Sequence, residues 1–412
     1  MKVRLTDKWI YIIAVINSLL LISIGGVFID FDTASYIDAW DNSFSHGVID
    51  VFRTPVYPVF IGLMKLLCGK YFLYAIIIVQ HIVFVISVFY FHKFLCYLIN
   101  SSITIQIITL IYIIIPATSS WANCILTESF AMSSTIFLFN NIISFHKKAS
   151  ISNVIWISFW VLFQIMLRPA CLYFIPAVAI VWIIYLKEQF KYAIYGILGI
   201  IIVGFIEIGY CAKFKENYGF FAPSLVSTYN NCWIAFPNGL MDSSYTDNPQ
   251  YKEFINTYNG KKVWAPNVVD KYGLLTVQKS ISESQHDKPI QWCIQVCHRF
   301  MQASITPLFA SYTGSIILRD LFGLNINILY ILLTGYAITL IYRKHKTKSF
   351  SKISLIIWIT VMGNLSMVII GAQNSWGRLL APSLPLIFIM FGQVFNYLQF
   401  NINGNTKETQ IE

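Results

Sequence analysis

The sequence predicts an all-α polytopic membrane protein with about ten transmembrane helices. Of its 412 residues, 57% are hydrophobic and 12% are charged, and the mean hydropathy is +0.63. A soluble globular chain carries about 25% charged residues, so this chain has too few of them to cover a water-facing surface of its size. The composition therefore excludes a soluble enzyme, a disordered chain and a fibrous protein.

Ten apolar segments approach the length of about 20 residues that a bilayer span needs. The predicted spans are 9–29, 71–92, 102–118, 128–145, 151–167, 170–186, 192–210, 322–342, 353–371 and 379–398. The first span follows a basic start, but Asp30 and Asp32 stand where a small-residue cleavage site would be expected. We therefore expect an uncleaved anchor rather than a removed signal peptide.

The lysines and arginines predict which ends of the spans face the cytoplasm. With the N-terminus inside, 14 basic residues fall in cytoplasmic segments and 5 in short outer loops, and the other 10 lie in one long segment. Basic residues are enriched on the cytoplasmic side, and long loops are largely exempt from that rule. The net charge of +10 thus indicates membrane orientation, and we expect no nucleic-acid partner.

The spans divide the chain into three parts. We predict a seven-span N-terminal catalytic module over 1–210, which includes a first outer loop over 30–70. A long extracytoplasmic segment over 211–321 follows, and a three-span module over 322–412 ends in a short cytoplasmic tail. The long segment exceeds the length of a plain connector, so it should carry structure of its own. Its half-apolar end, 291–318, should lie along the membrane.

Several chemistries have no motif in the sequence. Neither a phosphate-binding glycine loop nor an HExxH zinc motif is present, and the seven histidines are scattered. The eight cysteines form no CxxC pair and are interpreted as apolar packing residues. No metal site is predicted with certainty, although carboxylates at the outer face are a possible site for Mg²⁺ or Mn²⁺.

Ionisable residues gather at the outer ends of the spans. Asp30, Asp32, Asp38, Asp41, Asp50 and Arg53 follow the first span, Glu128 opens the fourth, Arg168 ends the fifth, Glu207 lies near the end of the seventh, and Arg378 opens the last. Charged groups at membrane depth are costly, so each is a candidate site residue.

These charged residues also have purely structural interpretations. The aspartates can form a solvated loop, and the arginines can anchor the chain to lipid phosphate. Thr127 and Glu128 can cap their helix, and Glu207 is better explained by a pairing inside the bundle.

Carboxylates and arginines on one membrane face suit sugar transfer from a lipid-linked phosphate. A carboxylate can take the proton of the attacking acceptor hydroxyl. The leaving phosphate needs cations rather than an acid, and arginine binds phosphate through two parallel hydrogen bonds.

At this point the residues resemble the GT-C glycosyltransferases, nearest to family 39 and the aminoarabinose-transferase-like group. Two segments of the first outer loop carry the resemblance, Asp32-Thr-Ala-Ser-Tyr36 and Arg53-Thr-Pro55-Val-Tyr57-Pro58. Three further segments agree with it: Leu126-Thr127-Glu128-Ser129, Leu167-Arg168-Pro169 and Arg378-Leu-Leu-Ala-Pro382. The resemblance covers about residues 9–210 and the last span, and the segment 211–321 matches no known pattern.

The resemblance implies roles for these positions. Asp32 would be the catalytic base, with Asp30 as its competitor two residues away. Arg53, Arg168 and Arg378 would contact the donor phosphate, with Arg378 the weakest of the three assignments. Glu128, Tyr36 and Tyr57 would support the acceptor or the loop.

The sequence thus predicts a membrane glycosyltransferase, transferring a hexose or a pentose from a polyprenyl-phosphate donor with inversion. The acceptor would be a lipid, a glycan or a protein of the cell envelope, and the site would face outward from a bacterial inner membrane. One alternative is a polysaccharide polymerase or ligase that uses a pyrophosphate-linked donor. A flippase or transporter is the other, but it would place polar groups at mid-membrane depth.

Overall fold

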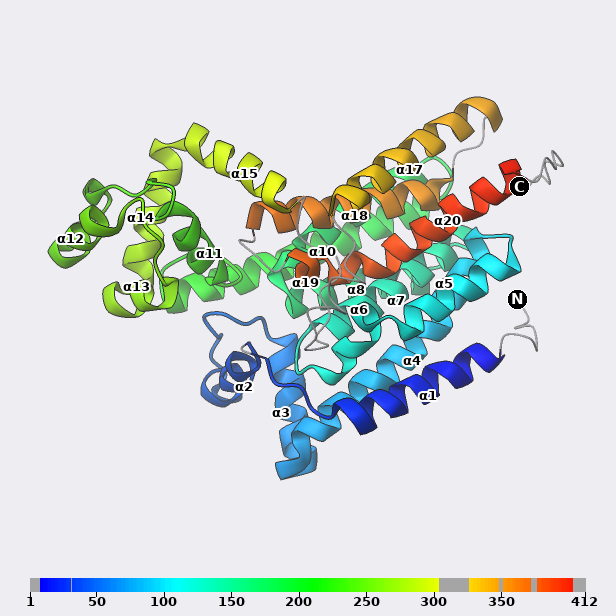
Figure 1. Ribbon diagram of the computed structural model, residues 1–412, viewed down its shortest axis with the longest axis horizontal. Helices are drawn as coiled ribbons and strands as arrows, with labels where there is room; N and C mark the ends of the chain where they lie inside the picture. Colours follow the sequence, from blue (N-terminus) through cyan, green and yellow to red (C-terminus); the bar gives the residue numbers. More distant parts are fainter. Residues whose placement is uncertain (1–7, 31, 304–325, 348–350, 372–375, 403–412) are drawn as a thin grey trace.

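A computed structural model describes residues 8–30, 32–303, 326–347, 351–371 and 376–402 (Figure 1). The described chain is helical almost throughout, and its only β-type pairing is an isolated bridge between Phe28 and Cys124. The all-α prediction is therefore confirmed for these residues.

Each of the ten predicted spans coincides with a helix. The helices are α1 (Lys8–Gly25), α4 (Phe72–Leu98), α5 (Ser102–Ile114), α7 (Glu128–Lys147), α8 (Ile151–Leu167), α9 (Phe174–Tyr185), α10 (Phe190–Tyr218), α17 (Ile326–Thr347), α18 (Lys352–Gly371) and α20 (Leu384–Ile402). In the bundle, α7 packs against α4, α8 and α20 and is buried along most of its length. Helices at the periphery, such as α1 and α10, expose isoleucine, leucine and phenylalanine side chains. Such apolar surfaces match a lipid environment.

The count of ten membrane-crossing helices is not confirmed. By length and composition, four helices of the described chain can cross a membrane: Lys8–Gly25, Val56–Leu98, Phe190–Tyr218 and Lys352–Ile370. A fifth span arises if Ser102–Ile114 and Pro116–Asn123, which meet at 59°, are taken together. The 17 residues of α8 make it about 25 Å long, which is shorter than the hydrocarbon core of about 30 Å.

The first outer loop contains two helices that the sequence analysis did not anticipate. They are α2 (Thr33–Asn42) and α3 (Val56–Cys68), which pack against each other and close the loop over the bundle. Gly62 permits this contact, because a Cβ atom there would lie 2.1 Å from the Trp40 ring. A short 3-10 turn, Gly69–Tyr71, then connects α3 to α4.

The described part of the long segment folds into five further helices beyond the end of α10. They are α11 (Val226–Ala235), α12 (Pro249–Tyr258), α13 (Ala265–Tyr272), α14 (Leu274–Asp287) and α15 (Pro289–Ala303). These helices enclose a small apolar core of their own, with Phe236, Tyr251 and Ile281 at its centre. Figure 1 shows them projecting to one side of the bundle. Residues 304–318 of the predicted membrane-surface stretch lie outside the described residues.

Candidate functional site

Five chain segments that are far apart in sequence bring their charged residues to one end of the bundle. Asp32 directly precedes α2, and Arg53 lies three residues before the start of α3. Glu128 is the first residue of α7, and Arg168 directly follows the last residue of α8. Arg378 belongs to the short helix α19 (Trp376–Leu379), which precedes α20. We call Asp30, Asp32, Glu128, Arg53, Arg168 and Arg378 the charged cluster.

Arg378 connects the three carboxylates of the charged cluster. Its Nη2 lies 2.8 Å from Asp32 Oδ2, and its Nε donates to Glu128 Oε1 over 2.6 Å. Its Nη1 lies 3.8 Å from Asp30 Oδ2. Hydrogen bonds between an arginine and a carboxylate are about twice as strong as neutral ones. The residue whose role was the least certain from sequence is therefore the one at the centre.

Arg53 holds Asp32 from the other side. Its Nη2 donates to Asp32 Oδ1 over 2.9 Å, and its Nε and Nη2 both donate to the Ser35 hydroxyl. The guanidinium carbon lies 4.1 Å from the centre of the Tyr36 ring, a favourable cation–π geometry. Ser35 was not singled out from sequence, although its position three residues after Asp32 places it on the same face of α2.

Glu128 is fully buried and joins two arginines. Its Oε1 accepts from Arg378 and lies 3.2 Å from Arg168 Nη1. The sequence analysis offered a capping role for Thr127 and Glu128. Thr127 is the N-cap residue but its side chain makes no cap hydrogen bond, whereas Glu128 lies in the first turn, as that interpretation expected. Arg168 and Arg378 bind the Glu128 carboxylate, because an unpaired buried charge would cost far more free energy than a missing cap hydrogen bond.

The backbone around Arg53 is fixed by Asp50. Its Oδ1 accepts hydrogen bonds from the amides of Phe52 and Arg53, each 2.8 Å long. The start of the long segment holds the same loop: the Tyr218 hydroxyl donates to the Ile49 carbonyl, and the Leu225 amide donates to the Val51 carbonyl. The position of Arg53 is thus determined by contacts from distant parts of the chain.

Tyr36 and Tyr57 lie beneath the charged cluster. Their rings meet edge to face at 5.1 Å, and both residues are buried. The Tyr57 hydroxyl donates to Gln80 on α4, whose amide in turn binds the carbonyls of Ala122 and Cys124. This geometry suits support of the loop better than contact with an acceptor.

The remaining outer acids lie outside the charged cluster. Asp41 pairs with Lys65 on α3, and Asp38 is exposed on α2. Glu207 on α10 contacts the thiol of Cys211 and forms no ion pair with any described residue. All eight cysteines are free thiols. Four of them are buried, as the packing role requires, but Cys293 and Cys297 are exposed, and for these two the packing interpretation is wrong.

The electrostatics of the cluster favour the charged form of Asp32. Burial raises the pKa of this carboxyl, but Arg53 and Arg378 outweigh it, so the pKa lies below its ordinary value of 3.8. Three carboxylates face three guanidinium groups, and the formal charges of the cluster cancel. Of the three acids, the Asp32 side chain is 34% exposed, Asp30 10% and Glu128 0%. Asp32 is therefore the carboxylate most accessible to a substrate.

A divalent cation would need oxygen ligands arranged around it. In the part of the chain that the structure describes, no three histidine, cysteine or acidic side chains are grouped so as to hold a metal ion. The guanidinium of Arg378 lies among Asp30, Asp32 and Glu128 and already provides positive charge there.

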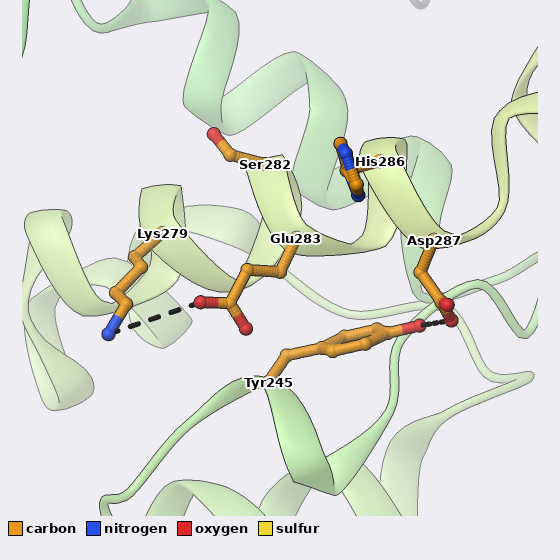
Figure 2. A pocket seen from close by; sticks show the side chains of 6 residues that line it. All are labelled: Tyr245, Lys279, Ser282, Glu283, His286 and Asp287. Carbon is orange, nitrogen blue, oxygen red and sulfur yellow. Dashed lines mark hydrogen bonds and ion pairs between the residues drawn. The ribbon is translucent and has the colours of Figure 1, made fainter.

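Two surface pockets lie on the long segment. One, of about 390 Å³, is lined by Tyr245, Lys279, Ser282, Glu283, His286 and Asp287 (Figure 2). There the Tyr245 hydroxyl donates to Asp287 Oδ2 over 2.5 Å, and Lys279 faces Glu283. The other, of about 420 Å³, lies between the end of α10 and the start of α14. Neither pocket includes a residue of the charged cluster.

The chain is similar to a solved structure but matches no family model. No family model matches the sequence, and no curated protein matches it. Among solved structures, the archaeal oligosaccharyltransferase AglB from Archaeoglobus fulgidus, in complex with an inhibitory peptide and a dolichol-phosphate, is similar over 100% of this chain and 53% of that chain. The sequence identity is 11% and the TM-score 0.47, and this chain spans about half the length of that protein. The functional argument therefore rests on the residues of this chain.

Proposed function

We propose that the chain is a membrane glycosyltransferase of the GT-C type. It would transfer a sugar from a polyprenyl-phosphate donor to a lipid, glycan or protein acceptor at the outer face of a bacterial inner membrane. One observation carries the proposal: three arginines and three carboxylates from distant segments meet at one end of an apolar helical bundle. A lipid-linked phosphate needs this combination, with cations for its headgroup and an apolar surface for its tail.

Asp32 is the proposed base. Its side chain is the most exposed of the three acids in the charged cluster. Asp30 belongs to the turn before α2, where its backbone amide donates a hydrogen bond to the Thr33 hydroxyl. The acceptor hydroxyl would give its proton to Asp32 while its oxygen attacks the anomeric carbon, which inverts the configuration there. The bond from that carbon to the phosphate oxygen breaks, and its electron pair leaves with the phosphate.

The arginines provide the electrostatic part of the proposed reaction. As the donor phosphodiester becomes a monoester, its charge goes from one negative to two, while Asp32 goes from charged to neutral. Arg53 and Arg378, which contact Asp32 before the reaction, can shift their hydrogen bonds to the phosphate as this charge moves. Binding of the phosphate to these arginines also removes the partners that lower the Asp32 pKa. Donor binding would thus make Asp32 a stronger base.

We further propose that the arginines of the charged cluster supply the positive charge at the donor phosphate that a divalent metal ion would supply in a metal-dependent enzyme. Arg378 lies among the three carboxylates that Mg²⁺ or Mn²⁺ would otherwise use. Chelation of divalent ions should then leave the transfer rate unchanged.

A transfer assay tests the proposal. The purified protein in liposomes is given radiolabelled polyprenyl-phosphate sugars and an envelope acceptor extract, with and without EDTA. Asp32→Asn is assayed beside Asp38→Asn, which removes an exposed carboxylate from the same helix. We expect transfer by the wild type, retention of activity in Asp38→Asn, and a loss of about 100-fold or more in Asp32→Asn.

Other outcomes would reject parts of the proposal. A fully active Asp32→Asn variant would remove the assigned base. Elongation from a pyrophosphate-linked oligosaccharide, without use of any monophosphate donor, would identify a polymerase instead. A loss of rate in EDTA that Mn²⁺ restores would contradict the metal-independent reaction.

A further inference from the structure

A second group of charged residues lies at the opposite end of the bundle. Lys93 on α4 and Lys147 on α7 each lie near the end of their helix, and Lys352 begins α18. Each lysine lies near a tyrosine ring, with the Nζ of Lys93 6.0 Å from the centre of Tyr90, Lys147 4.3 Å from Tyr97, and Lys352 5.1 Å from Tyr185. We call these three lysines and their tyrosines the lysine–tyrosine cluster.

Contacts through His146 join two of the three tyrosines of this cluster, Tyr97 and Tyr185. His146 lies between Tyr97 and Tyr185, with ring centres 6.3 and 5.8 Å away. The Tyr185 hydroxyl also forms a hydrogen bond of 2.7 Å with His146 Nδ1. Lys147 and Lys352 are therefore held on one aromatic surface, and Lys93 lies close enough to Lys147 for their charges to interact.

The charge of this surface is unbalanced. Glu188, which pairs with Lys352, is the only acidic residue among the described residues of these helix ends. Lys93 and Lys147 have no acidic partner in the described chain, and Lys148, Lys187 and Lys191 are close in sequence. Burial first, and then the charge of Lys93, lowers the pKa of Lys147, which lies beyond the predicted span ending at 145. The positive charges of Lys93 and Lys147 therefore repel each other, and a bound anion would offset this unfavourable electrostatic free energy.

An apolar surface begins beside these lysines. On α8, Ile151, Ile155, Trp156 and Phe159 are all exposed by 44% or more. Their spacing places them on one face of the helix, and the first of them follows Lys147 by four residues. Positive charge next to an exposed apolar helix face matches the two halves of a phospholipid.

We propose that Lys93 and Lys147 bind the phosphate headgroup of an anionic phospholipid, whose acyl chains lie on the exposed face of α8. Lysine near a membrane surface attracts anionic lipid, and tyrosine rings prefer the same interfacial depth. This site lies about 30 Å from the charged cluster, since the two are at opposite ends of the 20-residue helix α7. The inference is therefore independent of the proposed transfer reaction.

Lipid binding by matched variants tests this proposal. The purified full chain in neutral detergent is titrated with phosphatidylglycerol or with phosphatidylcholine of the same acyl chains, and bound lipid is counted by native mass spectrometry. The double variant Lys93→Gln/Lys147→Gln is compared with Lys261→Gln/Lys271→Gln. The control has the same change of net charge, and its lysines also lie near tyrosine rings, but on the long segment.

We expect the wild type to prefer phosphatidylglycerol. Each lysine should contribute about fivefold in affinity at low ionic strength, so the cluster variant should lose about 25-fold and the control less than about twofold. Lys93→Arg/Lys147→Arg keeps both charges and should keep the preference, which shows that loss in the glutamine variant is not misfolding.

Three results would overturn the proposal. They are equal affinity of the wild type for both lipids, an equal loss in the control variant, and displacement of the lipid by millimolar inorganic phosphate. The last would indicate a site for a free phosphate rather than for a lipid.

Discussion

The two ends of α7 carry charge in opposite ways. At the Glu128 end, arginines and carboxylates are buried together, and their formal charges cancel. At the Lys147 end, lysines are exposed over tyrosine rings with a single acid nearby. Buried charges need a partner because the interior does not solvate them, whereas exposed charges are solvated without one. The Glu128 end is therefore stabilised by pairs of opposite charges, whereas the Lys147 end is characterised by an excess of positive charge.

The choice of cation follows the same division. Arginine offers a planar group with five N–H donors that can bind several carboxylates at once, as Arg378 does. Lysine carries a compact, strongly hydrated charge that needs no fixed partner. The end with directed hydrogen bonds uses arginine, and the end that faces water uses lysine.

The largest expected difference between the two ends is in stability. Glu128→Gln leaves Arg168 and Arg378 buried with one anionic partner fewer, which should cost about 3–5 kcal/mol. Glu188→Gln breaks a pair between the exposed Glu188 and the half-buried Lys352 and should cost about 1 kcal/mol or less. Thermal unfolding of both variants in the same detergent measures the difference. Similar unfolding temperatures of the two variants would show that the ion pairs of the charged cluster do not stabilise the fold.

An intermediate effect is expected from exchanging the two cations. Arg168→Lys retains the charge but loses the forked donor geometry, so the apparent affinity for the donor should fall about tenfold, which corresponds to about 1.4 kcal/mol. The reverse exchange at the other end, Lys352→Arg, should leave donor kinetics unchanged. Unaltered donor kinetics in Arg168→Lys would favour a role as a lipid anchor instead.

The sequence predicted the elements better than the contacts between them. Apolar runs of about 20 residues located all ten helices, and counting lysines placed Asp32, Glu128 and Arg378 together at one end. The pairing of Glu128 with two arginines was missed, because it depends on how α7 and α8 are rotated against α19. A capping motif was the only local interpretation that the sequence offered at that position.

The first outer loop shows the same limit. Helix α2 is largely polar, and α3 is apolar but only 13 residues long, shorter than a span, so neither stood out. Both are stabilised by contacts across the loop, such as Trp40 on Gly62. Ser35 and Asp50 received no individual role because their function is to bind or orient Arg53, which is fixed only when the loop has folded.

The smallest expected effect concerns pH and tests the balance of charges at Asp32. Because Arg53 and Arg378 outweigh burial, the folded-state pKa of Asp32 lies below its unfolded value of about 3.8. A group of this kind contributes stability that is fully present above the unfolded pKa and is lost as the pH falls through the folded one. The difference in unfolding temperature between wild type and Asp32→Asn should therefore stay constant from pH 7 to pH 5 and shrink only below about pH 4.

Asp38→Asn provides the control, since it removes an exposed carboxylate of α2 that lies outside the charged cluster. The effect is small because the Asp32 side chain is 34% exposed and water screens its pairs. If the difference already narrows between pH 7 and pH 5, the folded pKa of Asp32 is raised rather than lowered. Burial would then outweigh the two arginines, and the charges of this end would not be balanced in the way the pairs indicate.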